Sequence, residues 1–328
     1  MRLNPSALYR RAGNTLSRLP DSPKKIVLIY EGVALGITLL LAVLSFYINE
    51  RIANMGGLSA LGQQAIWSTV QAVLELAVMI FLPLWQMGLV YVSLKWVRGE
   101  NATANDLLQG VRRFGPVLRL RLLELFLFAV LAMAISNVAS IIFLLTPFSN
   151  ELIEAMKPLL EQMEDPTLTE LTFTPEQMAE LMEKAMPLMI LCGVLFAVVF
   201  VFAFYRIRFA DYGVMDGKGA FRSLIDSFHY THKKSLQVAK VDLYFWWFYL
   251  LQVLCALLQM GDTLLTAVGV ELPISVDGAY FLFYILGGLA LLVLQWRCYA
   301  PVATTYAETY EILERSPAPE KKPKEYVW

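Results

Sequence analysis

Polar side chains interrupt the apolar stretches of this 328-residue chain, and they are the residues that could do chemistry. In the second stretch Gln71, Glu75 and Gln86 lie on roughly one helical face, and Pro83 lies between them. Ionisable groups among apolar residues are costly and are functional candidates by default, while proline can kink a helix. This face is predicted to look inward, where Glu75 either binds a cation or proton or hydrogen-bonds a neighbouring helix.

Further carboxylates, Glu31, Glu124 and Asp242, lie near the ends of the first, third and fifth apolar stretches. We expect them to share one layer with nearby charged residues, namely Arg121, Arg208 and Asp211. Such a layer could bind lipid head groups or a small cation, or it could consist of interfacial ion pairs only. Arg208 and Asp211 are three residues apart, which predicts a local pair.

The sequence gives no positive sign of catalysis. It contains no phosphate-binding loop, nucleophile elbow or zinc-protease motif, and no apolar stretch contains a histidine. An acidic dyad drawn from the three carboxylates would be needed for an enzyme. Asp226, His229 and His232 could approach one another, but a metal normally requires a further ligand and a supporting shell. We therefore predict a non-enzymatic protein without a metal site or cofactor.

The elements that must position these residues are long apolar helices. The chain is 57% hydrophobic and 17% charged, and about 20 apolar residues are enough to cross a bilayer as a helix. The stretches that qualify are 26–48, 65–94, 116–145, 186–205, 241–260 and 278–296. The fold class predicted is all-α, a polytopic membrane protein with six transmembrane helices arranged as three hairpins.

The basic residues predict the orientation. All but three of the 27 Lys and Arg residues lie before the first stretch, between the second and third or at the start of the third, between the fourth and fifth, or after the sixth. Cytoplasmic segments carry such an excess, so both termini are predicted to be cytoplasmic, in a bacterial plasma membrane. A net charge of -1 gives no support for nucleic-acid binding.

The remaining segments divide the chain further. Residues 1–25 form a basic cytoplasmic arm predicted to lie on the membrane surface, residues 26–314 form the transmembrane domain, and residues 315–328 form a disordered tail. The cytoplasmic connectors 95–115 and 206–240 show helical spacing of apolar residues, which predicts interfacial amphipathic helices. Residues 147–185 are acidic and predict an outer cap of two short helices.

One small-residue motif predicts a close approach of helices. Gly32 and Gly36 form a GxxxG pair in the first stretch, and small residues of this kind let transmembrane helices pack closely. The prediction is packing within the bundle.

The second half of the chain also resembles a known family. The residues that carry the resemblance are Tyr205, Phe209 to Asp211, Ala220 to Ser223, Ser227, Lys233, Lys234, Asp242 to Phe245, Trp247, Tyr299 to Pro301, Thr304, Tyr306, Tyr310 and Leu313. They are similar to those of a large bacterial family of six-span integral membrane proteins of uncharacterised function. That family is related to the membrane domain found beside glycerophosphoryl diester phosphodiesterases.

The resemblance implies a fold rather than a reaction. Among the matching positions, the family-motif residues are Asp211, Ser223, Ser227, Lys233, Pro301 and Tyr306. The chain departs from the family at Tyr230 to His232, where the usual methionine-lysine-glycine turn is missing. The phosphodiesterase catalytic domain has no counterpart here.

These observations favour a protein that binds or organises lipid or a protein partner in the membrane. The expected partners are anionic lipid head groups on the cytoplasmic side, with a protein partner or a second copy of the chain as further candidates. The alternative is a secondary transporter or permease with a midplane site around Glu75, because kinked helices and polar midplane residues are what such sites use.

Overall fold

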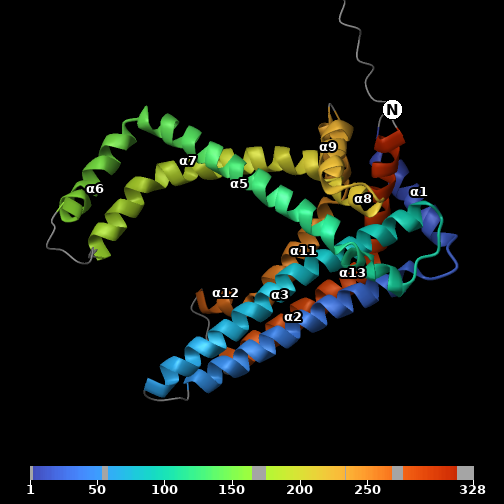
Figure 1. The fold of residues 1–328 in the computed structure, drawn as a ribbon, viewed down its shortest axis with the longest axis horizontal. Coiled ribbons are helices and arrows are strands. Elements are labelled where there is room, and N and C mark those ends of the chain that lie inside the picture. Colours follow the sequence, from blue (N-terminus) through green and yellow to red (C-terminus); the bar gives the residue numbers. More distant parts are fainter. Residues whose placement is uncertain (1–2, 54–57, 165–174, 233, 268–275, 316–328) are drawn as a thin grey trace, which may run out of the picture. The chain divides into compact units, whose positions relative to one another are not determined.

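The computed structural model describes residues 3–53, 58–164, 175–232, 234–267 and 276–315 of the chain, and these residues are almost entirely helical (Figure 1). The tail predicted to be disordered comprised residues 315–328; Arg315 is the last residue of a helix, and residues 316–328 lie outside the described residues. The helices in chain order are α1 (Pro5–Ser17), α2 (Pro23–Ala53), α3 (Leu58–Val97), the 3-10 helix η1 (Ala104–Leu108), α4 (Gln109–Arg112), α5 (Phe114–Leu144), α6 (Phe148–Glu164), α7 (Pro175–Ile207), α8 (Ala210–Met215), α9 (Ala220–Thr231), α10 (Ser235–Tyr244), α11 (Trp246–Gln259), α12 (Gly261–Ala267) and α13 (Val276–Arg315).

Within the described part of the chain, five helices are long and apolar enough to cross a membrane, or six if a bent pair is counted as one span. This indicates a multi-pass membrane protein. The long spans are α2, α3, α5, α7 and α13, as the hydropathy pattern predicted. Helices suit this environment because all their backbone hydrogen bonds are satisfied within one segment.

The fifth predicted span is broken. It consists of α10 and α11, which meet at a 61° bend. Phe245 lies between the two helices, and its backbone N–H donates to the carbonyl of Asp242 over 2.9 Å, a tighter turn than an α-helix makes. The hydropathy of residues 241–260 is continuous, so the sequence alone gave no sign of this break.

The chain divides into two compact units, residues 1–120 with 207–328 and residues 121–206. In the first unit α2, α3 and α13 run side by side, with α11 against α13 (Figure 1). A cluster of buried apolar residues joins these helices to the connector after α3; its members include Val27, Trp85, Trp96, Leu107 and Ala300.

The N-terminal arm packs on the protein. Asn4 caps α1 by accepting a hydrogen bond from the backbone of Ala7, and Pro5 occupies the first turn, where its missing N–H costs nothing. Leu8 and Ala12 are buried, and α1 contacts α13 and α10. The arm thus covers the last turns of α13, a contact that the prediction of a surface-lying segment did not include.

The second unit holds the predicted outer cap. Its first helix is α6, but the second predicted short helix is wrong, because α7 runs without interruption from Pro175 to Ile207. The apolar stripe of the cap continues directly into the span, and Pro187 does not end the helix. Lys184 on α7 pairs with Glu151 on α6 over 2.9 Å.

Close helix approach occurs elsewhere than at the GxxxG motif. A Cβ atom added at Gly32 or Gly36 would meet nothing within 4 Å, so the predicted packing there is wrong. A Cβ at Gly88 on α3 would instead lie 1.8 Å from the Leu107 carbonyl oxygen, and one at Gly110 on α4 would lie 1.8 Å from the Leu84 carbonyl oxygen. These two glycines let the connector lie directly on α3.

Candidate functional site

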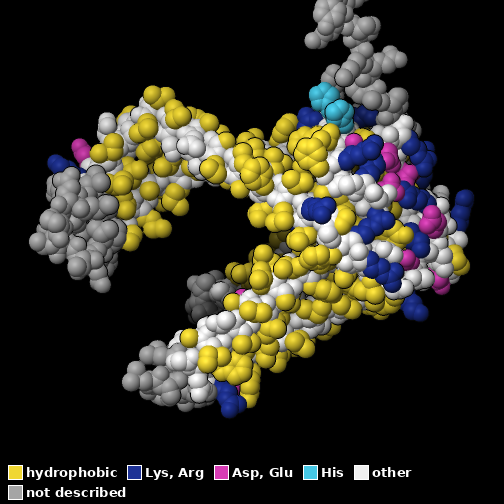
Figure 2. All heavy atoms as spheres, in the orientation of Figure 1, with side chains coloured by type: hydrophobic (Ala, Val, Ile, Leu, Met, Phe, Trp, Pro, Cys, Tyr) yellow, Lys and Arg dark blue, Asp and Glu magenta, His cyan; other side chains and the backbone are white. Residues whose placement is uncertain are grey.

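A network of ion pairs gathers at one end of the first unit, where Figure 2 shows the basic and acidic side chains concentrated. Arg98, just past the end of α3, bonds Glu311 over 2.8 Å and Asp216 over 2.6 Å. Burial lowers the pKa of Arg98, but these two carboxylates outweigh that effect and raise it. Arg315 pairs with the second oxygen of Glu311 over 2.7 Å.

Lys218 forms a second part of this network. Its ammonium group lies 2.6 Å from Glu314 and 3.3 Å from Asp226, and it donates to the Tyr230 hydroxyl over 2.8 Å. The ring centroids of Tyr230 and Tyr310 lie 5.3 and 5.8 Å away, within cation–π range. Burial lowers the pKa of Lys218, but its hydrogen bonds and charge partners raise it overall, so it stays charged.

The last turns of α13 therefore supply the carboxylates that pair with these basic residues. Glu308, Glu311 and Glu314 recur every third residue beyond Pro301, and each contacts a cation from a different part of the chain. These glutamates were not among the functional residues predicted from the sequence. Their spacing could have predicted them, because they form an acidic stripe with helical spacing directly after an apolar span. The connectors 95–115 and 206–240, in contrast, are rich in basic residues.

A buried polar group lies at the bend between α10 and α11. Asp242 accepts hydrogen bonds from the guanidinium of Arg208 and from the hydroxyl of Tyr306, and Tyr249 lies 2.6 Å from that hydroxyl. The Arg208 guanidinium also stacks over the Tyr306 ring, 4.2 Å from its centroid. Arg208 and Asp242 are each only 14% exposed. This bond joins Arg208 to a residue 34 positions away, and the local pair of Arg208 with Asp211 stays a prediction.

Helix α9 turns its hydroxyl side chains toward the protein. Ser223, Ser227 and Thr231 are at most 1% exposed. Ser227 accepts a hydrogen bond from the backbone N–H of Phe209 over 3.1 Å, and Ser223 packs on Gly213 of α8, where a Cβ would lie 2.8 Å from the serine oxygen.

The opposite surface of α9 has two edges. Phe221, Ile225 and Phe228 form an apolar edge with exposures of 65%, 44% and 36%. Arg222 and His229, both exposed, lie on the adjoining polar edge. An exposed apolar edge of this kind is typical of a surface that contacts a membrane or another protein.

The connector after α3 is built in the same way. Leu107 and Gly110 are buried against α3, whereas Leu108, Val111 and Phe114 are 41%, 37% and 44% exposed. The two connectors are also joined to each other. The guanidinium of Arg113 donates to the backbone carbonyls of Val214 and Met215, in the last turn of α8, over 2.8 Å each.

The capping box of η1 fixes where this connector begins. Asp106 accepts from the backbone N–H of Thr103 over 2.7 Å and from Lys95 over 3.1 Å. Burial raises the pKa of Asp106, but these bonds and the charge of Lys95 lower it overall. The arrangement is the reciprocal hydrogen bonding expected of a helix start.

The predicted midplane residues lie on the surface of α3. Glu75 and Gln86 are exposed and Gln71 is half-buried, so the prediction that this face looks inward is wrong for Glu75 and Gln86. Gln71 donates to Glu75 over 2.9 Å, one turn away on the same helix. Polar residues on one face predict an amphipathic helix with that face inward, but α3 packs through apolar residues such as Trp85 and Leu89 instead.

The other predicted carboxylates are divided between the two units. Glu31 is half-buried on α2 in the first unit, and Glu124 lies on α5 in the second unit, where it accepts from Arg121 over 2.6 Å. Asp242 belongs to the first unit and to the buried group described above.

Most of the residues that carried the family resemblance lie in the first unit. Ser223 and Ser227 form the packed face of α9, Tyr306 bonds Asp242, and Pro301 lies within α13. Asp211 is half-buried on α8. Lys233 lies outside the described residues.

The histidines do not form a metal centre in the described residues. His229 and His232 are both exposed, and no group of three or more potential protein ligands comes together in the part of the chain that the structure describes.

Comparison with known proteins identifies no relative of this chain. No protein-family model, no curated protein and no solved structure matches the chain.

Proposed function

We propose that this chain is a non-enzymatic integral membrane protein of a bacterial inner membrane that binds anionic lipid through its two cytoplasmic connectors. In this proposal the spans form three hairpins, both termini are cytoplasmic, and η1–α4 and α9 lie in the head-group region as interfacial helices. The lipid-facing residues are the exposed apolar side chains of the two connectors.

The orientation of α9 is the observation that carries the proposal. Its inward face consists of small hydroxyl residues, and its exposed apolar edge consists of Phe221, Ile225 and Phe228. Leaving one such side chain in water rather than burying it costs about 1.5–3 kcal/mol. Insertion of the apolar edge into the acyl boundary would recover this free energy while the polar edge stays in water.

Exposed cations accompany both apolar edges. Arg112 lies in the first connector, Arg119 follows it and Arg222 lies on α9, and all three are exposed. A basic residue near an anionic membrane surface contributes about 1 kcal/mol of binding free energy. The combination of apolar and basic residues is what favours anionic lipid over an uncharged bilayer.

The ion-pair network supports a single-sided topology. Arg98, Lys218 and Arg11 each bond a carboxylate near the end of α13. The segments assigned to the cytoplasm by their charge thus meet at one end of the first unit, as they would if they shared one side of a membrane.

Site-directed spin labelling of the full-length protein tests this proposal. Cys192, Cys255 and Cys298 are first replaced by serine, and single cysteines are then introduced by Phe221→Cys or Ile225→Cys. In vesicles containing phosphatidylglycerol we expect labels at both sites to be accessible to oxygen, which dissolves in lipid, and protected from a water-soluble nickel complex. A label introduced by His229→Cys, on the polar edge, is the control and should show the opposite preference.

Two results would contradict the proposal. One is accessibility of the labels at 221 and 225 to the nickel complex in vesicles, equal to that at 229. The other is protection from both reagents, because that result indicates a protein partner or a second copy over the apolar edge. Replacing phosphatidylglycerol with phosphatidylcholine should increase exposure to the nickel complex if the anionic charge matters.

A transporter is the second candidate, and the break between α10 and α11 favours it, because broken helices build the binding sites of many transporters. The midplane site would include Glu75 and its partner Gln71. For transport we expect Glu75→Gln to abolish cation-driven flux in proteoliposomes, with the thermal stability unchanged because Glu75 is exposed. Equal flux in the variant and the natural protein would exclude this site.

A further inference from the structure

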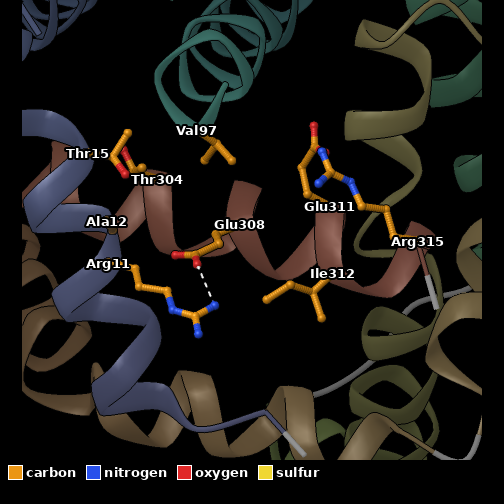
Figure 3. A pocket seen from close by; sticks show the side chains of 9 residues that line it. All are labelled: Arg11, Ala12, Thr15, Val97, Thr304, Glu308, Glu311, Ile312 and Arg315. Atoms are coloured by element: carbon orange, nitrogen blue, oxygen red, sulfur yellow. Dashed lines mark hydrogen bonds and ion pairs between the residues drawn. The ribbon is translucent and has the colours of Figure 1, made fainter. Parts of the chain in front are cut away.

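A cavity of about 240 Å³ lies between α1 and the last turns of α13. Its charged lining comes from Arg11 on α1 and from Glu308, Glu311 and Arg315 on α13 (Figure 3). Drug-sized ligands occupy pockets of about 300–1,000 Å³, so this volume fits a smaller molecule.

The two carboxylates of the cavity differ in how their oxygens are paired. Glu311 has both oxygens occupied, one by Arg98 at 2.8 Å and the other by Arg315 at 2.7 Å. Glu308 is only 15% exposed, and its one ion pair in the described residues is to Arg11 at 3.7 Å, beyond hydrogen-bond distance. The side chain of Arg11 is itself 63% exposed.

A mostly buried carboxylate without a close donor is costly, because burial removes its water without replacing the hydrogen bonds. Glu308 therefore has capacity for a cationic donor.

The arginines at the rim call for an anion. Arg11 and Arg315 are 63% and 77% exposed, and guanidinium groups match phosphate oxygens in geometry and charge. A phosphate monoester offers three acceptor oxygens, enough for both arginines and for Thr15, which also lines the cavity. The phosphodiester of a lipid head group offers two unesterified oxygens, one for each arginine. The charged residues that line the cavity, Arg11 and Arg315 against Glu308 and Glu311, sum to zero, which suits a zwitterionic ligand.

We propose that this cavity binds an aminoalkyl phosphate, with its primary ammonium on Glu308 and its phosphate on Arg11 and Arg315. The group would arrive either as free phosphoethanolamine or as the head group of phosphatidylethanolamine. The site is separate from the connector surfaces, so it does not depend on the function proposed above.

Thermal unfolding of the full-length protein in detergent tests the site. Phosphoethanolamine is expected to raise the unfolding temperature in a saturable way. Phosphocholine has the same phosphate but no ammonium N–H, so it should bind about tenfold more weakly or worse, the effect of losing one charge-assisted hydrogen bond. Ethanolamine alone and inorganic phosphate alone should each have little effect at the same concentrations.

Variants of the protein test whether the ammonium group of the ligand binds Glu308. Glu308→Gln keeps the shape of the side chain and should remove the preference for phosphoethanolamine over phosphocholine. Glu100→Gln changes an exposed glutamate outside the cavity and should bind both ligands as the natural protein does. If Glu308→Gln fails to fold, the ligand series on the natural protein still decides the matter.

Nanodiscs distinguish the two sources of the group. If the lipid is the ligand, native mass spectrometry should detect phosphatidylethanolamine retained by the natural protein and lost from Glu308→Gln. If the free compound is the ligand, it should stabilise the protein equally in nanodiscs of phosphatidylethanolamine and of phosphatidylcholine. The proposal is overturned if neither phosphoethanolamine nor phosphatidylethanolamine shows saturable binding. It is also overturned if Glu308→Gln still prefers phosphoethanolamine over phosphocholine as the natural protein does.

Discussion

Replacing Asp242 with alanine is expected to lower the free energy of unfolding by about 3–5 kcal/mol, the usual effect of removing one member of a buried ion pair. Asp242 accepts from both Arg208 and Tyr306, and the two charged side chains are each 14% exposed. Removal of the carboxylate leaves a desolvated guanidinium without this partner, and it also removes the acceptor of a buried hydroxyl. The measurement is thermal or denaturant unfolding of the purified protein in detergent.

The matched control is an exposed ion pair. Glu151 bonds Lys184 but is 49% exposed, and exposed pairs contribute roughly 0–1 kcal/mol, so Glu151→Ala should have little effect. A double-mutant cycle of Arg208→Gln with Asp242→Asn then isolates the pair, because residues in direct contact show an interaction energy of about 0.5–3 kcal/mol. Additive effects of the two changes would show that the charges are not coupled.

Replacing Gly88 with alanine should also cause a large loss of stability. The added Cβ would lie 1.8 Å from the Leu107 carbonyl oxygen, 2.5 Å from its carbonyl carbon and 2.8 Å from its Cα. All three are backbone atoms, so no side-chain rotation can relieve the overlap, and the connector must move off α3. Overpacking of this kind costs about 1–3 kcal/mol and sometimes more.

Gly32→Ala is the control for this change. Gly32 also lies within a long helix, but a Cβ there meets nothing within 4 Å. Alanine is favoured over glycine in a helix by about 1 kcal/mol, so Gly32→Ala should be neutral or stabilising in the same unfolding measurement. A loss of stability at Gly32 equal to that at Gly88 would mean that the GxxxG motif, and not the connector, is the site of close packing.

The consequence of Gly88→Ala should extend to lipid. If η1 and α4 leave α3, then Leu108, Val111 and Phe114 lose the orientation that exposes them. The lipid accessibility of a spin label at position 111 would then change, whereas a label at 225 on α9 reports whether the second connector moves with the first. Arg113 is the link through which such coupling would act.

The sequence by itself determined where the long helices lie, although α7 begins before its predicted apolar stretch and α13 ends well after it. Helical hydrogen bonds are local, and the thickness of a bilayer sets the length of an apolar run. For this reason the spans α2, α3, α5, α7 and α13 could be located from composition alone. The proline at position 175 and the capping residues around Asp106 likewise predict helix starts from a few neighbouring residues.

Only the tertiary structure decided which faces and charges meet. The bond from Arg98 to Glu311 joins residues 213 positions apart, and that from Arg208 to Asp242 joins residues 34 apart. The amphipathic pattern of α9 is compatible with burial of either face. Its hydroxyl face packs inward because Ser223 fits against Gly213 and Ser227 accepts from Phe209, and such fit depends on the shape of neighbours distant in sequence.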